Sequence, residues 1–248
     1  MKVLGCIPAR YGSTRFPGKV LARDTGKYLI QHTYEQACRA KRLEKIIIAT
    51  DDEKVAAAVR SFGAEAVMTS AEHSSGTDRI AEAVADIDVE IVVNLQADEP
   101  EIDPANIDYL AQLLLENPGY PMATLAAGFE DAEQVADPNI VKVVLAGDGS
   151  AVYFSRWPIP YDREKAGVGE VGQYLRHLGI YAYRKDFLMK ITTLPQTPLE
   201  KTEKLEQLRA LENGYKILVG RVRHVCPGID TPEQYAAFVE RCRRARPL

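Results

Sequence analysis

Short apolar runs alternate with amphipathic segments through the first half of the chain. The apolar runs are typical of buried strands and lie at residues 3–7, 45–49, 64–68 and 91–95. Helical spacing of apolar residues predicts helices over residues 26–40, 52–62 and 77–87. This order is that of βαβ units. We therefore expect an α/β fold, with a mixed, mostly parallel sheet covered by helices on both faces.

The pattern changes in the second half. Residues 140–145 and 151–154 are strand-like and flank Gly147-Asp148-Gly149, a hairpin turn sequence. The strand expected over residues 175–183 alternates, which places His177, Gly179, Tyr181 and Tyr183 on one face. Residues 157–172 are rich in proline, glycine and charge without periodicity. They indicate a long loop that covers a site or reaches a partner subunit.

Proline after a capping residue marks three helix starts. The pairs are Asp103-Pro104, Thr197-Pro198 and Thr231-Pro232. Glu200 completes a capping box in the second helix, which we expect to end at Gly214. No linker or repeat interrupts the pattern, so residues 1–248 are interpreted as a single domain, in which residues 140–195 form a mixed strand and loop segment.

Composition excludes several classes of function. The chain has 248 residues, is 46% hydrophobic and carries a formal net charge of −4. This charge provides no global attraction for nucleic acid or an anionic membrane. Neither a membrane-spanning stretch nor a leader sequence is expected, so the protein is interpreted as cytoplasmic. The cysteines, Cys6, Cys38, Cys226 and Cys242, lack metal-site spacing and are expected to be reduced.

The loop after the first strand, residues 8–19, carries the most informative chemistry. Arg10, Arg15 and Lys19 lie among glycines and hydroxyl residues, a composition suited to holding a polyphosphate. It is not a P-loop, because five residues separate Gly12 from Gly18 and valine follows Lys19. The alternative is a solvated basic loop. Ligands of parallel sheets bind at the carboxyl ends of strands, which favours the phosphate hypothesis.

Acidic residues are expected at the same sheet edge. Asp98 and Glu99 follow the strand of residues 91–95, and Asp230 precedes the last helix. A carboxylate facing phosphates needs a divalent cation between them, and Mg²⁺ is the usual one. The alternatives are that Asp98 or Glu99 caps a turn before Pro100, and that Asp230 only helps to start the helix.

Three further segments could contact a ligand. Residues 73–79 open a helix with hydroxyl residues, glycine and a cation, which suits a nucleotide base or phosphate. His177 and Tyr181 share a polar strand face, although a lone histidine is more often structural. Arg156 carries a planar guanidinium suited to a carboxylate.

In this order the segments resemble the 3-deoxy-manno-octulosonate (Kdo) cytidylyltransferase family, which makes CMP-Kdo for lipopolysaccharide biosynthesis. The resemblance spans nearly the whole chain, in residues 7–21, 73–79, 94–100, 153–156, 175–183, 198–209 and 228–232. It implies a nucleotide-diphospho-sugar transferase type fold, usually a homodimer, in which residues 140–195 contribute to sugar binding and dimerisation. The implied reaction transfers CMP from CTP to Kdo and releases pyrophosphate.

The resemblance also assigns residues to roles. Those implied to bind CTP are Arg10, Ser13, Lys19, Ser75, Thr77 and Arg79. Asp98 and Asp230 are implied to hold Mg²⁺, and with Arg10 and Lys19 they form the implied catalytic group. Those implied to contact the sugar are Gln96, Arg156, His177, Tyr181, Glu206 and Gln207. No side chain is assigned as a general base.

Two positions depart from the family pattern, and several functions compete. Ala97 stands where family members usually have glycine, and Val20 where they commonly have proline. The nearest alternative is a cytidylyltransferase for an amino-substituted Kdo, another acidic sugar or a sugar phosphate. A glycosyltransferase is disfavoured because Asp98-Glu99-Pro100 lacks the usual Asp-x-Asp. A catalytically silent nucleotide-binding regulator is the third class.

Overall fold

The computed structural model describes residues 1–12 and 16–245. Its contacts group the chain into two compact units. The first unit comprises residues 1–108 and 226–248, and the second comprises residues 109–225. Each unit is compact in itself, and the interpretation of residues 1–248 as one domain stays a prediction.

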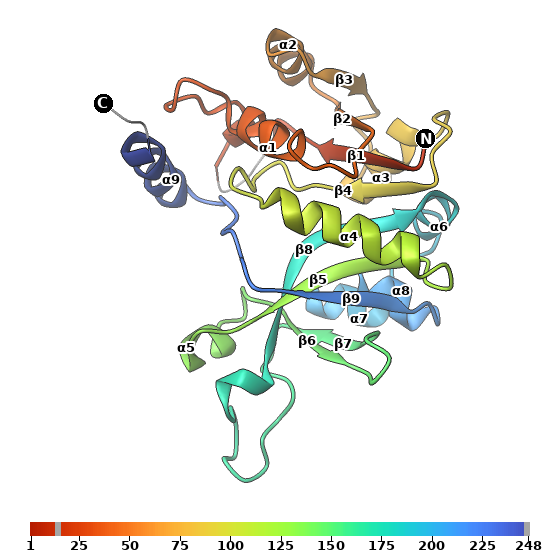
Figure 1. Ribbon diagram of the computed structural model, residues 1–248, viewed down its shortest axis with the longest axis vertical. Helices are drawn as coiled ribbons and strands as arrows, with labels where there is room; N and C mark the ends of the chain where they lie inside the picture. Colours follow the sequence, from red (N-terminus) through yellow and green to blue (C-terminus); the bar gives the residue numbers. More distant parts are fainter. Residues whose placement is uncertain (13–15, 246–248) are drawn as a thin grey trace. The chain divides into compact units, whose positions relative to one another are not determined.

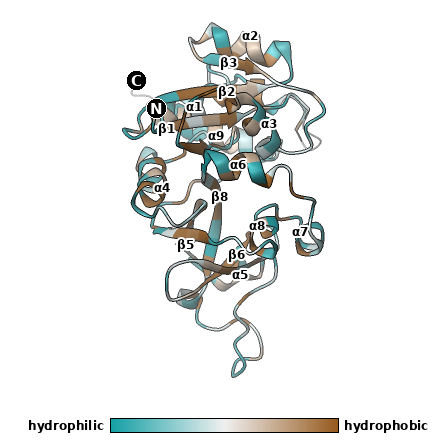
Figure 2. Cartoon of the chain, turned by 90° about the vertical axis from the view of Figure 1, so that its right-hand side faces the viewer, coloured by the Kyte–Doolittle hydropathy of each residue, from teal (hydrophilic) through white to brown (hydrophobic). Residues whose placement is uncertain are grey.

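Four parallel strands form the centre of the first unit. They are β1 (Val3–Pro8), β2 (Lys45–Thr50), β3 (Glu65–Met68) and β4 (Ile91–Asn94), in the order β3-β2-β1-β4 (Figure 1). β1 and β2 are among the most apolar segments in Figure 2, as expected of strands buried on both faces. Cys6 in β1 is fully buried, which raises the pKa of its thiol. All four strands predicted for the first half are thus confirmed.

The first unit also contains helices. They are η1 (Lys19–Leu21), α1 (Leu29–Ala37), α2 (Glu53–Ser61), α3 (Gly76–Val84) and, from the end of the chain, α9 (Pro232–Ala245). Asp52 caps α2, because its Oδ1 accepts hydrogen bonds from the N–H groups of Lys54 and Val55. Gly63, with φ of 82°, follows the end of α2. A local capping residue therefore fixes the start of α2.

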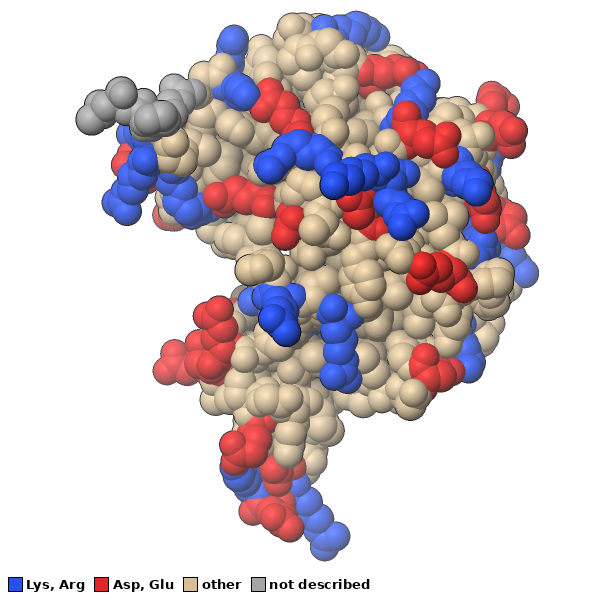
Figure 3. Space-filling model, viewed as in Figure 1, with Lys and Arg blue, Asp and Glu red and all other residues tan. Residues whose placement is uncertain are grey.

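Charged residues are interspersed on the face shown in Figure 3, and basic side chains gather at the end of α9. Arg241 of α9 makes an ion pair with Glu101, with 2.5 Å between Nη2 and Oε2. This pair fastens α9 to the segment before α4 (Pro104–Glu116). None of the described helices is long and apolar enough to cross a membrane.

The second unit contains antiparallel and parallel strands. They are β5 (Met122–Gly128), β6 (Lys142–Leu145), β7 (Ala151–Ser155), β8 (Leu175–Arg184) and β9 (Ile217–Val222). β5 is antiparallel to β8 and parallel to β9, and β6 is antiparallel to β7 and β8. Gly149, with φ of 80°, lies in the β6–β7 turn. The predicted hairpin and α/β class with a mixed, mostly parallel sheet are confirmed, whereas β5 was not predicted.

One predicted helix is two helices. The expected helix from Thr197 to Gly214 is α7 (Pro198–Glu203) followed by α8 (Leu208–Glu212). Lys204 adopts a left-handed conformation, with φ of 54°, and ends α7. The turn lets Arg209 reach back to Glu200, with 2.6 Å between Nη2 and Oε1, and both side chains are buried. In one continuous helix these two residues would lie about two and a half turns apart, so the ion pair requires the break.

Three shorter helices complete the second unit: α5 (Ala132–Ala136), η2 (Val171–Gln173) and α6 (Lys185–Ile191). The long loop expected over residues 157–172 is confirmed up to the start of η2. Within it, residues Asp162 and Gly167 pair through their backbones.

Gly220 of β9 tests the packing of the second unit. A Cβ added there would overlap Leu113 and would lie 2.7 Å from Tyr109 Cε1 and 2.9 Å from Leu125 Cδ2. We expect Gly220→Ala to lower the free energy of unfolding by about 1–3 kcal/mol, because a tightly packed core resists added volume. Urea unfolding measures this change. Gly128→Ala is the control, since its Cβ would meet nothing within 4 Å; equal losses in the two variants would contradict the packing argument.

Candidate active site

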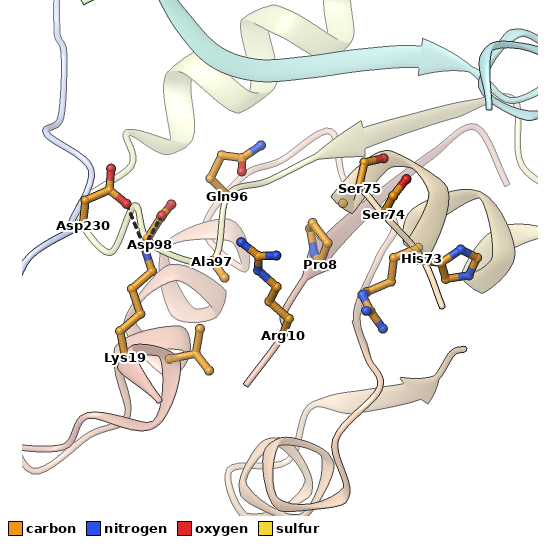
Figure 4. Close-up of a pocket in the computed structure, with 13 residues that line it drawn as sticks. Pro8, Arg10, Lys19, His73, Ser74, Ser75, Gln96, Ala97, Asp98 and Asp230 are labelled. Atoms are coloured by element: carbon orange, nitrogen blue, oxygen red, sulfur yellow. Dashed lines mark hydrogen bonds and ion pairs between the residues drawn. The ribbon is translucent and has the colours of Figure 1, made fainter. Parts of the chain in front are cut away.

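A pocket of about 380 Å³ lies in the first unit, beyond the carboxyl ends of β1 and β4. It is lined by Pro8, Arg10, Lys19, Val20, His73, Ser74, Ser75, Gly76, Arg79, Gln96, Ala97, Asp98 and Asp230 (Figure 4). The basic loop, the acidic segment and the start of α3 therefore meet here, as the sheet-edge argument predicts. Ser13 lies outside the described residues.

Lys19 lies between the two predicted metal ligands. Its Nζ is 2.6 Å from Asp98 Oδ2 and 3.0 Å from Asp230 Oδ1, as the dashed lines in Figure 4 show. It also donates to the carbonyl oxygen of Ile229 at 2.9 Å. The Lys19 side chain is only 12% exposed, so these charge-assisted hydrogen bonds are partly shielded from water. One cation thus offsets part of the charge of two carboxylates.

Backbone contacts bring these acids together from opposite ends of the sequence. The N–H of Ile229 donates to the carbonyl oxygen of Asp98 at 2.8 Å. Ile229 is 1% exposed and belongs to an apolar cluster with Leu29 of α1 and Phe238 of α9. Packing of α9 therefore fixes Asp230 beside Asp98.

Only one of the two neighbouring acids predicted after β4 reaches the pocket. Asp98 lines it, whereas burial and the nearby charge of Asp98 raise the pKa of Glu99 to about 8. Glu99 therefore carries little charge at pH 7. The carboxylates available to a cation in this pocket are those of Asp98 and Asp230.

These two carboxylates suit Mg²⁺, a hard cation that prefers oxygen ligands. No group of three His, Cys, Asp or Glu residues that could hold a metal occurs among residues 1–12 and 16–245. A divalent cation here would therefore complete its coordination with ligand phosphates and water, as Mg²⁺ usually does.

Arg10 supplies positive charge at the other side of the pocket. Its side chain extends toward Gln96 and Ala97 in Figure 4. Among the described residues it makes no ion pair, so its charge remains available to an anionic ligand.

The predicted residues of α3 have mainly structural contacts. Ser75 caps α3, because its Oγ accepts from the N–H of Asp78 at 3.1 Å. Arg79 is 4% exposed and donates to Asp51 Oδ2 at 2.7 Å and Thr69 Oγ1 at 2.6 Å. Both still line the pocket, whereas Thr77 is buried and is not one of the lining residues.

Sequence reasoning gave no individual role to His73, which also lines the pocket. Its Nε2 is hydrogen-bonded to Glu82 Oε2, which also accepts from the N–H of Ser70 at 2.9 Å. These contacts lower the pKa of the Glu82 carboxyl. His73 and Glu82 are nine residues apart, and no sequence motif links them, so the pair could not be predicted from the sequence.

Five of the six residues implied for the sugar lie in the second unit. Two of them are in ring contact: the ring centroids of His177 and Tyr181 are 5.4 Å apart with the rings tilted by 46°, and Phe154 meets His177 edge-on at 4.9 Å. The predicted shared face of His177 and Tyr181 is therefore confirmed. Gln96 belongs to the first unit, where its Nε2 donates to Asn94 Oδ1 at 3.3 Å.

Hydrogen bonds define the tautomer of His177. Thr124 Oγ1 lies 2.7 Å from the carbonyl oxygen of Ile180 and 3.0 Å from His177 Nε2. A hydroxyl has one proton, and the shorter bond to Ile180 takes it, so Nε2–H of His177 must donate to Thr124. Burial lowers the pKa of His177 to about 3. The ring is thus neutral at pH 7, with Nδ1 as its hydrogen-bond acceptor.

Of the remaining sugar residues, Glu206 and Gln207 lie between α7 and α8, and Arg156 directly follows β7. Arg156 donates from Nε to the carbonyl oxygen of Glu203 at 2.7 Å and from Nη1 to that of Pro138 at 3.0 Å. Gln207 is 5% exposed, and its Nε2 has no hydrogen-bond partner in the described part of the chain. Glu206 Oε1 lies 3.8 Å from Arg209 Nη2. A buried donor such as that of Gln207 would be satisfied by a ligand oxygen.

The low pKa of His177 predicts a pH dependence of stability. The unfolded chain binds a proton at this position below about pH 6.5, whereas the folded chain does not until about pH 3. His177 thus contributes fully to stability above pH 6.5, and the contribution is lost as the pH falls from 6.5 toward 3. The slope is up to about 1.4 kcal/mol per pH unit.

Urea unfolding at pH 7.0, 5.5 and 4.5 checks this prediction. His177→Asn should lose less stability between pH 7.0 and 4.5 than the parent. His224→Asn is the control at an exposed histidine and should follow the parent. Parallel pH profiles of His177→Asn and the parent would contradict the prediction.

Comparisons with known proteins agree on one family. Residues 4–217 match the model of the cytidylyltransferase family. The 3-deoxy-manno-octulosonate cytidylyltransferase of Solibacter usitatus (strain Ellin6076) is 52% identical over 232 residues, covering 94% of this chain and 91% of that protein. The protein of the same name from Geobacter sulfurreducens is 45% identical over 251 residues, covering 98% and 100%.

Solved structures agree with the fold. The structure of CMP:2-keto-3-deoxy-manno-octonic acid synthetase complexed with CTP has a TM-score of 0.92 and 42% sequence identity, covering 99% of this chain and 100% of that one. A cytidylyltransferase from Leptospira borgpetersenii, 20% identical with a TM-score of 0.67, shares the fold.

Proposed function

Because this chain belongs to the 3-deoxy-manno-octulosonate cytidylyltransferase family, we propose that it transfers CMP from CTP to Kdo and releases pyrophosphate. The observation that carries the proposal is the pocket in which Arg10 faces the cluster of Lys19, Asp98 and Asp230. This pocket combines cations for phosphates with carboxylates for a divalent cation. The relatives that carry this name match it over 91% and 100% of their own lengths.

In this reaction the anomeric hydroxyl oxygen of the sugar bonds to the α-phosphorus of CTP. The bond from that phosphorus to the bridging oxygen breaks, and the hydroxyl proton passes to water. Mg²⁺, when bound, supplies charge that polarises the α-phosphate. Asp98 and Asp230 would hold it. Arg10 and Lys19 stabilise the negative charge that develops on the departing pyrophosphate.

The proposed nucleotide contacts involve the rest of the pocket. Ser75 and Arg79 line it and are held rigidly by their own contacts, so they present fixed polar groups to CTP. Thr77 is proposed to support this wall from within, because its side chain is buried. Ser13 keeps its proposed role in phosphate binding on the basis of family resemblance.

The sugar contacts follow from donor and acceptor chemistry. Arg156 offers its remaining N–H groups to the sugar carboxylate, and His177 offers Nδ1 to a hydroxyl. Gln207 offers its unpartnered amide, while Gln96, Tyr181 and Glu206 are proposed to contact other hydroxyls. Ionisation of Tyr181 is suppressed because burial raises its pKa.

We further propose that the enzyme is a cytoplasmic homodimer that activates Kdo for lipopolysaccharide biosynthesis. Trp157, Tyr161 and Val152 are 75%, 63% and 58% exposed in the second unit. Exposed apolar residues of this kind, aromatic ones above all, are typical of interface cores. The four free cysteines suit a reducing compartment.

A pyrophosphate-release assay tests the function. The nucleotides are CTP, UTP, ATP and GTP, each with Mg²⁺, and the acceptors are Kdo, its amino-substituted form, another acidic sugar and a sugar phosphate. Release from CTP with Kdo is the expected result. Release with another acceptor but none with Kdo would overturn the proposed substrate, and CTP binding without any release would favour a regulator.

A further inference from the structure

Lys142 of β6 is an unusually buried cation. The residue is 0% exposed, although lysine is almost never fully buried without a partner. Its Nζ donates to the carbonyl oxygens of Asp137 at 2.9 Å, Ile140 at 2.7 Å and Arg156 at 2.5 Å. These three bonds use all three ammonium N–H groups. Burial lowers the pKa of Lys142.

The same contacts surround the guanidinium of Arg156. Lys142 bonds to residues 137 and 140, and the carbonyl oxygen of Pro138, between them, accepts from Arg156 Nη1 at 3.0 Å. Lys142 thus shapes the turn that holds one side of the guanidinium, and it also holds the Arg156 carbonyl directly.

Glu203 holds Arg156 from the other side. Its Oε2 accepts from the Arg156 N–H at 2.9 Å, and its Oε1 accepts from Ser155 Oγ at 2.7 Å. Its own carbonyl oxygen accepts from Arg156 Nε at 2.7 Å. Both backbone polar groups of Arg156 are therefore bonded by charged side chains.

We propose that Lys142 is a positioning residue that holds the Arg156 guanidinium ready for the carboxylate of the sugar. The inference rests on the proposed function of Arg156. A buried cation is costly, and an apolar side chain of similar size often stabilises a fold equally well. Unlike an apolar side chain, the Lys142 ammonium hydrogen-bonds three carbonyl oxygens at once and so fixes the backbone around Arg156. Its effect should therefore appear in sugar binding, not only in stability.

Lys142→Met is the first test, with Arg184→Met as the matched control. Arg184 also donates to three backbone carbonyls in the second unit, those of Leu114 at 2.7 Å, Tyr120 at 3.1 Å and Asn117 at 3.4 Å. We expect Lys142→Met to raise KM for Kdo at least about tenfold, because small misplacements of binding groups weaken productive geometry. KM for CTP should change less than about twofold, and Arg184→Met should leave both KM values within about twofold.

A double-mutant cycle with Arg156→Ala tests the route of the effect. Without the guanidinium, Lys142→Met should no longer raise KM for Kdo. A KM that is unchanged in Lys142→Met, or that rises equally in the Arg156→Ala background, would overturn the proposal. Should Lys142→Met fail to fold, Lys142→Arg replaces it. The planar guanidinium of arginine cannot reproduce the three hydrogen bonds that the Lys142 ammonium makes to carbonyl oxygens. Pyrophosphate release by the unmodified protein with CTP and Kdo tests the proposed function separately.

Discussion

Asp98→Asn is expected to lower turnover by roughly 10²–10³-fold, the range seen when one charge-stabilising group is removed from an active site. Asparagine keeps the size of the side chain and one oxygen but removes the negative charge that a divalent cation requires. Asp98 Oδ2 also lies 2.6 Å from Lys19 Nζ, so the substitution frees Lys19 from its shortest ionic contact. Steady-state pyrophosphate release over a range of Mg²⁺ concentrations measures the effect.

The fold should survive this substitution. Asp98 is 29% exposed, and partly exposed ion pairs contribute modestly to stability, about 1 kcal/mol or less. The melting temperature should therefore change by only a few degrees. Asp88→Asn, at an exposed acid after α3, is the matched control and should retain full turnover. Full turnover in Asp98→Asn itself would remove Asp98 from the proposed metal site.

Local patterns were sufficient for much of the first unit. The apolar runs of β1, β2 and β4 each form a strand that pairs with a neighbour in the sheet. The caps of α2 and α3 are encoded within three residues of each helix start. Strands and helices that are encoded by neighbouring residues therefore form where the sequence predicts them. The pocket at this sheet edge could be predicted for the same reason.

The missed elements depend on contacts between distant segments. β5, with the sequence MATLAAG, is rich in alanine and has little intrinsic preference for a strand. It is a strand because β8 and β9 pair with it on either side. The break at Lys204 likewise accompanies the buried pair of Glu200 and Arg209, a contact that helical periodicity does not predict.

The candidate site divides in the same way. Lys19, Asp98 and Asp230 could each be selected from local sequence, but the packing of α9 decides that one ammonium lies between both acids. Lys142 had no sequence signature, because its partners are backbone carbonyls that any residue can supply. Residues whose roles depend on backbone geometry are the ones that sequence patterns cannot reveal.

Lys19→Met is expected to lower kcat/KM by roughly 10²–10³-fold, because it removes the cation that we propose to stabilise the departing pyrophosphate. Lys27→Met is the matched control: Lys27 also makes a 2.6 Å ion pair, with Glu35, but it lies outside the pocket. The control should retain turnover within about twofold, as expected for a surface ion pair. Turnover within tenfold of the parent in Lys19→Met would contradict the catalytic assignment.

The same variant should respond more strongly to Mg²⁺ without any nucleotide. In the parent, a cation entering between Asp98 and Asp230 must displace the Lys19 ammonium, whose Nζ lies 2.6 Å and 3.0 Å from their oxygens. In Lys19→Met the two carboxylates repel each other, and bound Mg²⁺ relieves that repulsion. Ligand binding stabilises the folded state by RT ln(1 + [L]/Kd), so tighter binding gives a larger increase in melting temperature. Thermal unfolding at 0 and 10 mM Mg²⁺, roughly the range over which weak sites fill, should therefore show a greater increase for Lys19→Met than for the parent or Lys27→Met. Equal increases in all three proteins would mean that Lys19 and the metal do not compete for these carboxylates.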